Sequence, residues 1–310
     1  MNEFSAITTT KNQAKKKEKT FIFFMMLFPV IHWCIFWLYV NFSSIALAFQ
    51  DTRTGIFTWD NFKAVGESLT SPYGEIRLAL KNTLMYFSTS LLIISPCGLL
   101  MSYFLFKRIV GNQAFRIIFY LPAIISGVVM VTCYTTFIDP HGPLGNILNW
   151  FNVSIPPEGW LARKETATTM ILIYNIWTGF TGNILLFCGA MARVPMEVLE
   201  SSKLEGCGAF REFVQIIIPL IFPTLSTQII LLFTGVFTSS GPILLFDPNC
   251  SYDTVTLSYW IFKQVYGFGT VGGSGSYNLV SATGLCFTLL GVPIILFVRW
   301  VMDRIPVAEY

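Results

Sequence analysis

The residue types that most often do chemistry are scarce in this chain. Residues 267–272 read Gly-Phe-Gly-Thr-Val-Gly, which is the G-x-G-x-x-G spacing of a dinucleotide-binding turn. That spacing indicates a nucleotide site only between a strand and a helix of a βαβ unit. Here it precedes a long apolar run, so we expect a flexible connection instead. No glycine is followed directly by lysine, so the phosphate-binding loop G-x-x-x-x-G-K-[ST] is absent as well.

The remaining candidates for a reactive site are equally isolated. The seven cysteines include no C-x-x-C pair, and five of them lie in apolar runs, where a thiol behaves as a small hydrophobe. We therefore expect neither a zinc site nor a disulfide framework. No Ser-His-Asp set, metal cluster or carboxylate pair can be assembled within the apolar runs, so the prediction is a protein that is not an enzyme. A membrane-embedded enzyme would need such a cluster.

Composition places these residues in a membrane protein. Of the 310 residues, 54% are apolar and 16% aromatic but only 12% are charged, about half the usual charged fraction of a soluble domain. A net charge of +3 is too small to indicate a nucleic-acid partner. The elements that position any site are therefore helices within a lipid bilayer.

Six charge-free runs are long enough to cross the hydrocarbon core, which takes about 20 residues. They cover residues 21–49, 82–106, 117–138, 166–192, 219–245 and 278–298. We expect Pro219 and Pro223 to break the fifth run near its start. His32 is the one ionisable residue within the six runs. We expect its ring to pack as an aromatic side chain near Pro29; the alternative is that it relays protons.

The positions of Lys and Arg orient the spans, because these residues resist translocation. Thirteen of the 20 basic residues fall in the amino-terminal tail and the alternate segments that would share its side, so both termini are expected in the cytoplasm. The first run could instead be a cleaved signal peptide, which would leave five spans. Its apolar region is longer than the usual 7 to 15 residues, so we interpret it as a membrane helix.

The segment between the fourth and fifth spans carries the most specific pattern. Pro195 suits the first turn of a helix, and Gly206 suits a left-handed helix end. A second helix is predicted from Ala209, with one apolar face formed by Phe210, Phe213, Val214 and Ile217 and an opposite polar face formed by Arg211, Glu212 and Gln215. The mixed charge of this helix-turn-helix favours a groove in another protein over an anionic lipid surface.

At these residues the sequence resembles the transmembrane permease subunits of binding-protein-dependent ATP-binding cassette importers, specifically the sugar-importer branch. The signature of that family is Glu-Ala-Ala, three residues, Gly, nine residues and Ile-x-Leu-Pro. The corresponding positions here are Glu200-Ser201-Ser202, Gly206 and Ile216-Ile217-Ile218-Pro219, with Glu205 where the family usually has aspartate. Similar matches are Asn82-Thr83-Leu84, Leu121-Pro122, Asp139-Pro140, Trp177-Thr178-Gly179-Phe180 and Ala192-Arg193-Val194-Pro195.

The resemblance implies a transporter subunit that does not itself hydrolyse ATP. In this family the loop docks into a groove on an ATPase subunit, so Glu200, Ser201, Ser202, Glu205, Gly206 and Pro219 are the expected coupling residues. The implied partners are a second permease subunit, two ATPase subunits that bind ATP and Mg²⁺, an extracytoplasmic solute-binding protein, a carbohydrate and the lipid bilayer of a bacterial plasma membrane. This chain itself would bind no cofactor or nucleic acid. Residues 142–160 and 247–275 are the candidate contacts for the binding protein.

Neutral polar residues near the middle of the later spans are the candidates for the solute path. They are Asn175, Trp177, Asn183, Thr227, Gln228 and Thr283. Amides and aromatic faces suit an uncharged sugar, although hydrogen bonds between helices are an equally good interpretation of each residue.

The predicted fold is all-α: a polytopic membrane protein with six transmembrane helices and a cytoplasmic helix-turn-helix. We divide the chain into a basic tail (1–20), a transmembrane domain (21–305) whose coupling loop covers about 193–219, and a short tail (306–310). The predicted function is ATP-driven import of a carbohydrate, which we expect to be an oligosaccharide. The alternative is an autonomous carrier or channel for a small neutral solute.

Overall fold

The computed structural model describes residues 2–51, 54–151, 156–266 and 277–306, so the G-x-G-x-x-G segment lies outside the described residues. Within this part of the chain the fold is helical, and the one extended pairing is an isolated bridge between Gln50 and Phe57. The prediction of an all-helical chain is confirmed. The first half contains α1 (Asn2–Trp33), η1 (Cys34–Tyr39), α2 (Val40–Ala48), α3 (Asp60–Thr70), α4 (Glu75–Thr89), η2 (Ser90–Ile94), α5 (Ser95–Phe106), α6 (Asn112–Ile124), α7 (Gly127–Ile138) and α8 (Pro143–Trp150). The second half contains η3 (Trp160–Ala162), α9 (Lys164–Met191), α10 (Met196–Leu204), α11 (Ala209–Glu212), η4 (Phe213–Ile217), α12 (Ile218–Gly235), α13 (Ile243–Phe246), α14 (Leu257–Tyr266) and α15 (Tyr277–Asp303).

Within the described residues, five helical stretches are long and apolar enough to cross a membrane. They are Lys16–Ala48, Glu75–Phe106, Lys164–Met191, Ala209–Gly235 and Tyr277–Asp303. A sixth crossing exists if α6 and the helices after it count as one span, but the chain bends by 111° between Ile124 and Gly127. The sequence predicted one uninterrupted run at 117–138. Ser126 explains the break, because its side chain accepts a hydrogen bond from Val129 N and so starts a new helix there.

The fifth span begins ten residues earlier than the apolar run suggested. Helix continues from Ala209 through Pro219 and Pro223 to Gly235, so the predicted break at these prolines is wrong. A π-helical turn at Phe213–Ile217 precedes Pro219, and Ile218 N donates to the Phe213 carbonyl oxygen five residues back. This wider turn relieves the clash that a proline ring makes with the preceding turn of an α-helix.

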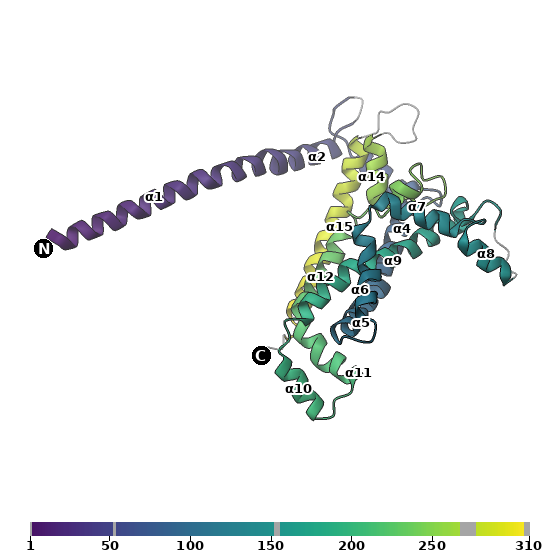
Figure 1. Cartoon of the computed structure of the whole chain (residues 1–310). Coiled ribbons are helices and arrows are strands. Elements are labelled where there is room, and N and C mark those ends of the chain that lie inside the picture. The colour runs from purple at the N-terminus through teal and green to yellow at the C-terminus, as the bar shows by residue number, and fades with distance from the viewer. Residues whose placement is uncertain (1, 52–53, 152–155, 267–276, 307–310) are drawn as a thin grey trace.

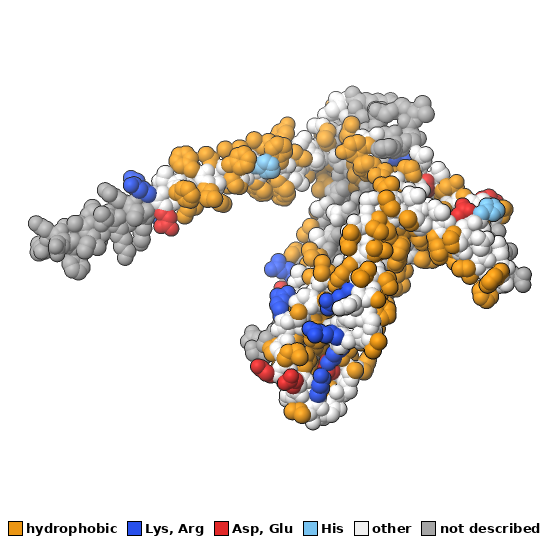
Figure 2. All heavy atoms as spheres, in the orientation of Figure 1, with side chains coloured by type: hydrophobic (Ala, Val, Ile, Leu, Met, Phe, Trp, Pro, Cys, Tyr) orange, Lys and Arg blue, Asp and Glu red, His pale blue; other side chains and the backbone are white. Residues whose placement is uncertain are grey.

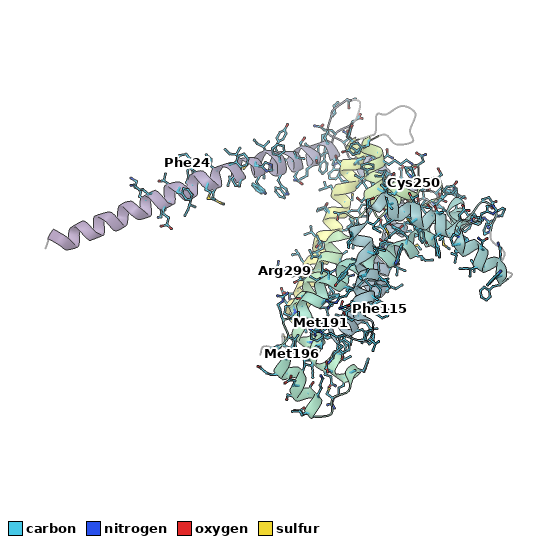
Figure 3. All side chains as sticks on the ribbon, viewed as in Figure 1. Phe24, Phe115, Met191, Met196, Cys250 and Arg299 are labelled. Atoms are coloured by element: carbon cyan, nitrogen blue, oxygen red, sulfur yellow. The ribbon has the colours of Figure 1, made fainter. Side chains whose placement is uncertain are left out.

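The first span stands apart from the rest of the molecule. Figure 1 shows α1 and η1 projecting away from the bundle, with only α2 reaching it beside α15. Apolar side chains cover most of the described part of the projecting segment from Phe21 onward (Figure 2), and Phe24, which is 65% exposed, lies on this segment far from the bundle (Figure 3). The His32 ring lies 4.6 Å from the Phe36 ring on the exposed surface of this segment. An exposed apolar surface of this length requires a lipid or protein environment.

The bundle is closest packed where α5 crosses α9. A methyl group added at Gly98 would lie 2.8 Å from Asn183 Cβ, and one added at Gly179 would lie 2.9 Å from Ile94 Cδ1. Small residues at these positions let the two backbones approach, which is the usual basis of helix packing in membranes. The α5–α9 pair therefore forms a fixed wall for the elements beside it.

The opposite end of the bundle from α10 is capped by polar contacts. Asn82 Nδ2 donates to the carbonyl oxygens of Asp253 and Val255, both at 2.8 Å, and Thr83 Oγ1 accepts from Leu257 N at 2.9 Å. The buried carboxylate of Asp247 accepts from the backbone of Ser251 and Tyr252 and from Thr254 Oγ1. These bonds attach the segment before α14 to the start of the second span.

Candidate functional site

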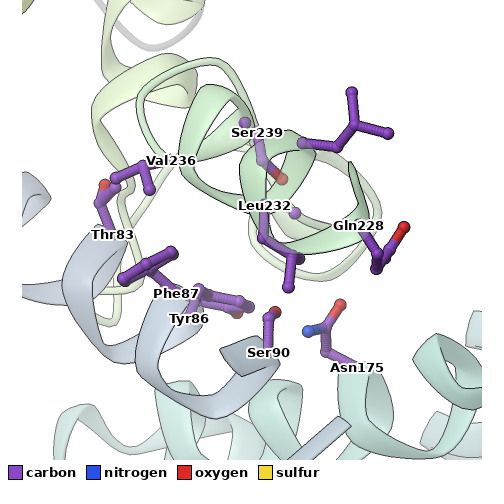
Figure 4. Close-up of a pocket in the computed structure, with 12 residues that line it drawn as sticks. Thr83, Tyr86, Phe87, Ser90, Asn175, Gln228, Leu232, Val236 and Ser239 are labelled. Carbon is purple, nitrogen blue, oxygen red and sulfur yellow. The ribbon is translucent and has the colours of Figure 1, made fainter. Parts of the chain in front are cut away.

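A cavity of about 270 Å³ lies between α4, α9 and α12. Figure 4 shows Tyr86 and Ser90 approaching it from one wall, Asn175 from a second and Leu232 from a third. The lining residues are Thr83, Tyr86, Phe87, Ser90, Asn175, Gln228, Leu231, Leu232, Gly235, Val236, Ser239 and Gly241. None of them carries a charge at neutral pH. The walls combine hydroxyl and amide groups with aromatic faces, which suits a neutral solute rich in hydroxyl groups.

Tyr86 brings an unused hydrogen-bonding group to this cavity. Its hydroxyl oxygen is buried and has no hydrogen-bond partner among the described residues. Its ring packs against Gly241, where an added methyl group would lie 3.4 Å from Tyr86 Cε1. Buried hydroxyls without partners are rare, because each costs free energy that a bond would offset. The Tyr86 hydroxyl can therefore donate a hydrogen bond to, or accept one from, a molecule in the cavity.

A second hollow continues from the first toward the 193–219 loop. Ser90, Asn175, Gln228 and Leu232 line both, and Ile94, Gly179, Gly182, Asn183 and Leu186 line the second alone. Gln228 Nε2 donates to Asn183 Oδ1 at 2.8 Å between α12 and α9. Together the two hollows form an uncharged passage of mixed polar and apolar lining along these helices.

Three of the six residues predicted for the solute path line this passage: Asn175, Asn183 and Gln228. The other three lie elsewhere. Trp177 is 41% exposed, Thr227 Oγ1 donates to the Pro223 carbonyl oxygen, and the buried Thr283 Oγ1 donates to that of Leu279. Sequence reasoning missed the contribution of the second span. Its signal was present, because Thr83, Tyr86, Phe87 and Ser90 recur at the i, i+3, i+4 and i+7 spacing of one helix face.

The 193–219 loop has the bent form that its sequence predicted. Helix α10 ends at Leu204, and Gly206, two residues later, has a φ of +74°, the left-handed conformation that favours glycine. Gly206 N donates to the Lys203 carbonyl oxygen at 3.0 Å, and Cys207 N donates to that of Ser202 at 2.9 Å. This pair of bonds is a Schellman motif, which fixes the direction in which the chain leaves a helix.

The predicted coupling residues of this loop differ in exposure. Glu200, Ser201, Glu205 and Gly206 are exposed, whereas Ser202 is buried, with Oγ donating to the Leu199 carbonyl oxygen, and Pro219 is half-buried. Leu199 packs into a core formed by the ends of α5, α9 and η4, whose fully buried members include Phe187, Met191 and Ile217. The loop is therefore held rigidly at its base and presents Glu200 and Glu205 at its outer surface.

The second helix of the loop does not bury the face that periodicity predicted. Phe210, assigned to the apolar face, is 81% exposed, whereas Glu212, assigned to the polar face, is only 2% exposed. The π-helical turn that begins at Phe213 explains the difference, because it adds a residue to the turn and rotates the flanking residues relative to an α-helical pattern. Arg211 and Gln215 stay on the exposed side, where Arg211 Nε donates to Gln215 Oε1 at 2.8 Å.

Nothing in the described part of the chain groups three or more His, Cys, Asp or Glu residues so that they could hold a metal ion. The arrangement is a passage joined to a rigid surface loop. The profile of the family described as binding-protein-dependent transport system inner membrane component matches residues 94–306. The chain belongs to this family.

Two permease proteins are similar to the chain over most of their length. The lactose transport system permease protein LacF of Rhizobium radiobacter is 22% identical over 78% of this chain and 78% of its own. The arabinooligosaccharides transport system permease protein AraP of Bacillus subtilis (strain 168) is 23% identical over 81% of this chain and 80% of its own.

A solved structure has the same fold as this permease. It is a bacterial alginate ABC transporter in complex with an alginate pentasaccharide-bound periplasmic protein, and one chain matches with a TM-score of 0.78 at 23% identity. The match covers 94% of this chain and 97% of that one. The family match and the long apolar helices make the chain a multi-pass membrane protein of a bacterial transport system.

Proposed function

We propose that this chain is the permease subunit of an ATP-driven importer for a neutral carbohydrate. The observation that carries the proposal is the uncharged passage between α4, α9 and α12, with the unpartnered Tyr86 hydroxyl in its wall. A sugar offers hydroxyl groups to Tyr86, Asn175 and Gln228 and C–H surfaces to Phe87. The carbohydrate solutes named for LacF and AraP support the same class.

The proposed energy source is a partner ATPase that binds ATP and Mg²⁺. The bent 193–219 loop is the proposed docking element, with Glu200 and Glu205 as polar contacts and Gly206 setting the angle between α10 and α11. Its exposed apolar side chains, Leu204 at 90% and Phe210 at 81%, support a protein partner at this surface.

The proposed topology has six crossings, with the bent α6–α7 pair as the third and both termini in the cytoplasm. The proposed transmembrane domain covers residues 21–305, flanked by tails 1–20 and 306–310. The projecting first span would then contact lipid and a second permease subunit, since no residue of its most apolar window is buried within the chain. Residues 142–160 and 247–275 would face the solute-binding protein on the outer side; positions 152–155 and 267–275 of these ranges lie outside the described residues.

Reconstitution tests this function. The chain, alone or with the subunits that purify with it, is placed in liposomes loaded with ATP and Mg²⁺, and uptake of lactose and an arabinooligosaccharide is measured with the binding protein outside. We expect no uptake by the chain alone, and uptake by the complex that needs both ATP and the binding protein. Uptake by the chain alone would show an autonomous carrier or channel instead.

A further inference from the structure

A buried ion pair connects the 193–219 loop to the second span. Lys107 Nζ, one residue beyond the end of α5, lies 2.5 Å from Glu212 Oε1 in α11. The Glu212 side chain is 3% exposed and that of Lys107 is 24% exposed. The carboxylate is thus withdrawn from water and depends on this lysine for its counter-charge.

Tyr103 adds hydrogen bonds to the same contact. Its hydroxyl donates to the Ala209 carbonyl oxygen at 3.0 Å and lies 3.4 Å from Glu212 Oε1. The Tyr103 ring packs 4.9 Å from the ring of Phe213, and Lys107 Nζ lies 5.8 Å from the Tyr103 ring centre. The last turn of α5 and the adjoining Lys107 therefore hold α11 and the start of η4 through three kinds of contact.

The way the passage is assembled makes this contact significant. Helix α9 leads directly into the loop, and α11 continues without a break into α12, so two walls of the passage are covalent extensions of the loop. The third wall, α4 with η2, is about 100 residues away in sequence and belongs to the span that ends directly before Lys107. This span and the loop also share an apolar core, which includes Leu99, Leu199 and Ile217, but apolar packing is non-directional. Among the described residues, the directional contacts between them are the ion pair and the hydrogen bonds of Tyr103.

We propose that Tyr103, Lys107 and Glu212 form a mechanical link that makes the α4–α5 span move with the 193–219 loop, so that all three walls of the passage respond together when a partner ATPase moves the loop. The inference rests on the proposed function. The three residues are positioning residues, since none of them lines the passage. This role explains why the Glu212 carboxylate is buried although the amphipathic pattern of its helix places it on the exposed face.

The test measures how much sugar is moved for each ATP hydrolysed by the reconstituted complex. Removing one charge of the pair strands the other, so the informative variant is the double substitution Lys107→Met with Glu212→Gln. We expect this variant to assemble with its partners and hydrolyse ATP, but to import about fivefold less of the accepted probe per ATP. Tyr103→Phe, which keeps the ring packing, should reduce the ratio by about twofold.

The matched control is Asp303→Asn, which removes an exposed pair with Arg299 (3.7 Å) on α15 and should leave the ratio unchanged. A double variant that assembles and imports as much sugar per ATP as the wild type would overturn the link. If the double variant does not assemble, an unchanged ratio in Tyr103→Phe overturns it, and a reduced ratio supports it.

A second measurement separates failure of the link from failure of the proposed function. The substitution Ser90→Cys, in a background without other cysteines, places a single thiol in the wall of the passage. The rate at which a maleimide labels this thiol, with and without ATP, measures how accessible the passage is. The link predicts an ATP-dependent change that disappears in the double variant, whether or not lactose or the arabinooligosaccharide is the solute. A wild-type complex that accumulates neither probe contradicts the proposed function for them, while persistence of the labelling change in the double variant contradicts the link.

Discussion

Gln228 Nε2 donates a hydrogen bond of 2.8 Å to Asn183 Oδ1, which joins α12 to α9 where the two hollows of the passage meet. Asn183 is 7% exposed, and Gly98 packs against its Cβ. The amide of Asn183 is therefore fixed in position, while Gln228 reaches it across the passage.

The first prediction concerns the free energy of this contact. In a double-mutant cycle of Asn183→Ala and Gln228→Ala, we expect a coupling of about 0.6 kcal/mol and at most about 1.7 kcal/mol, as for other side-chain hydrogen bonds between membrane helices. Reversible unfolding in mixed micelles measures it. Fully additive effects of the two substitutions would show that the bond does not hold the helices together.

The second prediction uses the unpartnered hydroxyl of Tyr86. Tyr86→Phe removes no bond within the described chain, so unfolding stability should change by less than about 0.5 kcal/mol. Sugar uptake should need about fivefold more substrate, the equivalent of one lost hydrogen bond. Tyr134→Phe is the matched control, because that hydroxyl donates to the Met170 carbonyl oxygen at 2.8 Å. It should cost about 1 kcal/mol of stability without altering the substrate requirement. If Tyr86→Phe lowered stability without altering the substrate requirement, and Tyr134→Phe did the opposite, Tyr86 would not contact the sugar.

The third prediction compares two glycines of the 193–219 loop. Gly206 has a φ of +74°, whereas Gly208 has a φ of −71°, which any residue adopts. An alanine at position 206 should therefore cost about 1 kcal/mol, expressed as weaker co-purification of the ATPase, while Gly208→Ala should not. Gly206→Asn should be intermediate, because asparagine tolerates the left-handed region. Equal retention of the ATPase by all three variants would mean that the bend does not set the docking angle.

The fourth prediction is a pH profile. Burial of the Cys250 thiol, in the segment between α13 and α14, raises its pKa to about 11, against the smaller opposing effect of Lys263. A higher pKa leaves less thiolate, so at pH 8 alkylation should be about a hundredfold slower than for an ordinary thiol with a pKa of about 8.5.

This profile is measured on a variant that retains Cys250 as its only cysteine. The alkylation rate should keep rising about tenfold per pH unit from pH 8 to 10, where an ordinary thiol levels off. Denaturation should restore ordinary reactivity at pH 8. A folded protein whose rate levels off near pH 9 would show that the thiol is not buried.

The amino-acid sequence predicted the features that depend on one residue at a time. A charge within the hydrocarbon core costs free energy, so charge-free runs mark the spans. For the second, fourth and sixth spans, most of the predicted ends lie within a few residues of the observed ones. The exception is the start of the second span, where Glu75, Arg77 and Lys81 lie in helix before the apolar run. Glycine is favoured at a left-handed position, so Gly206 predicted the end of α10.

Other features depended on the tertiary structure, because they follow from which residues meet. Periodicity assumed α-helical pitch and so placed Glu212 on the exposed face, but the π turn at Phe213–Ile217 and the counter-charge of Lys107 placed it in the interior. The bend before Gly127 was likewise invisible in hydropathy, which measures how apolar a run is and not its direction. The passage combines faces of three spans distant in sequence, so Tyr86 became a candidate only when α4 was placed opposite α12.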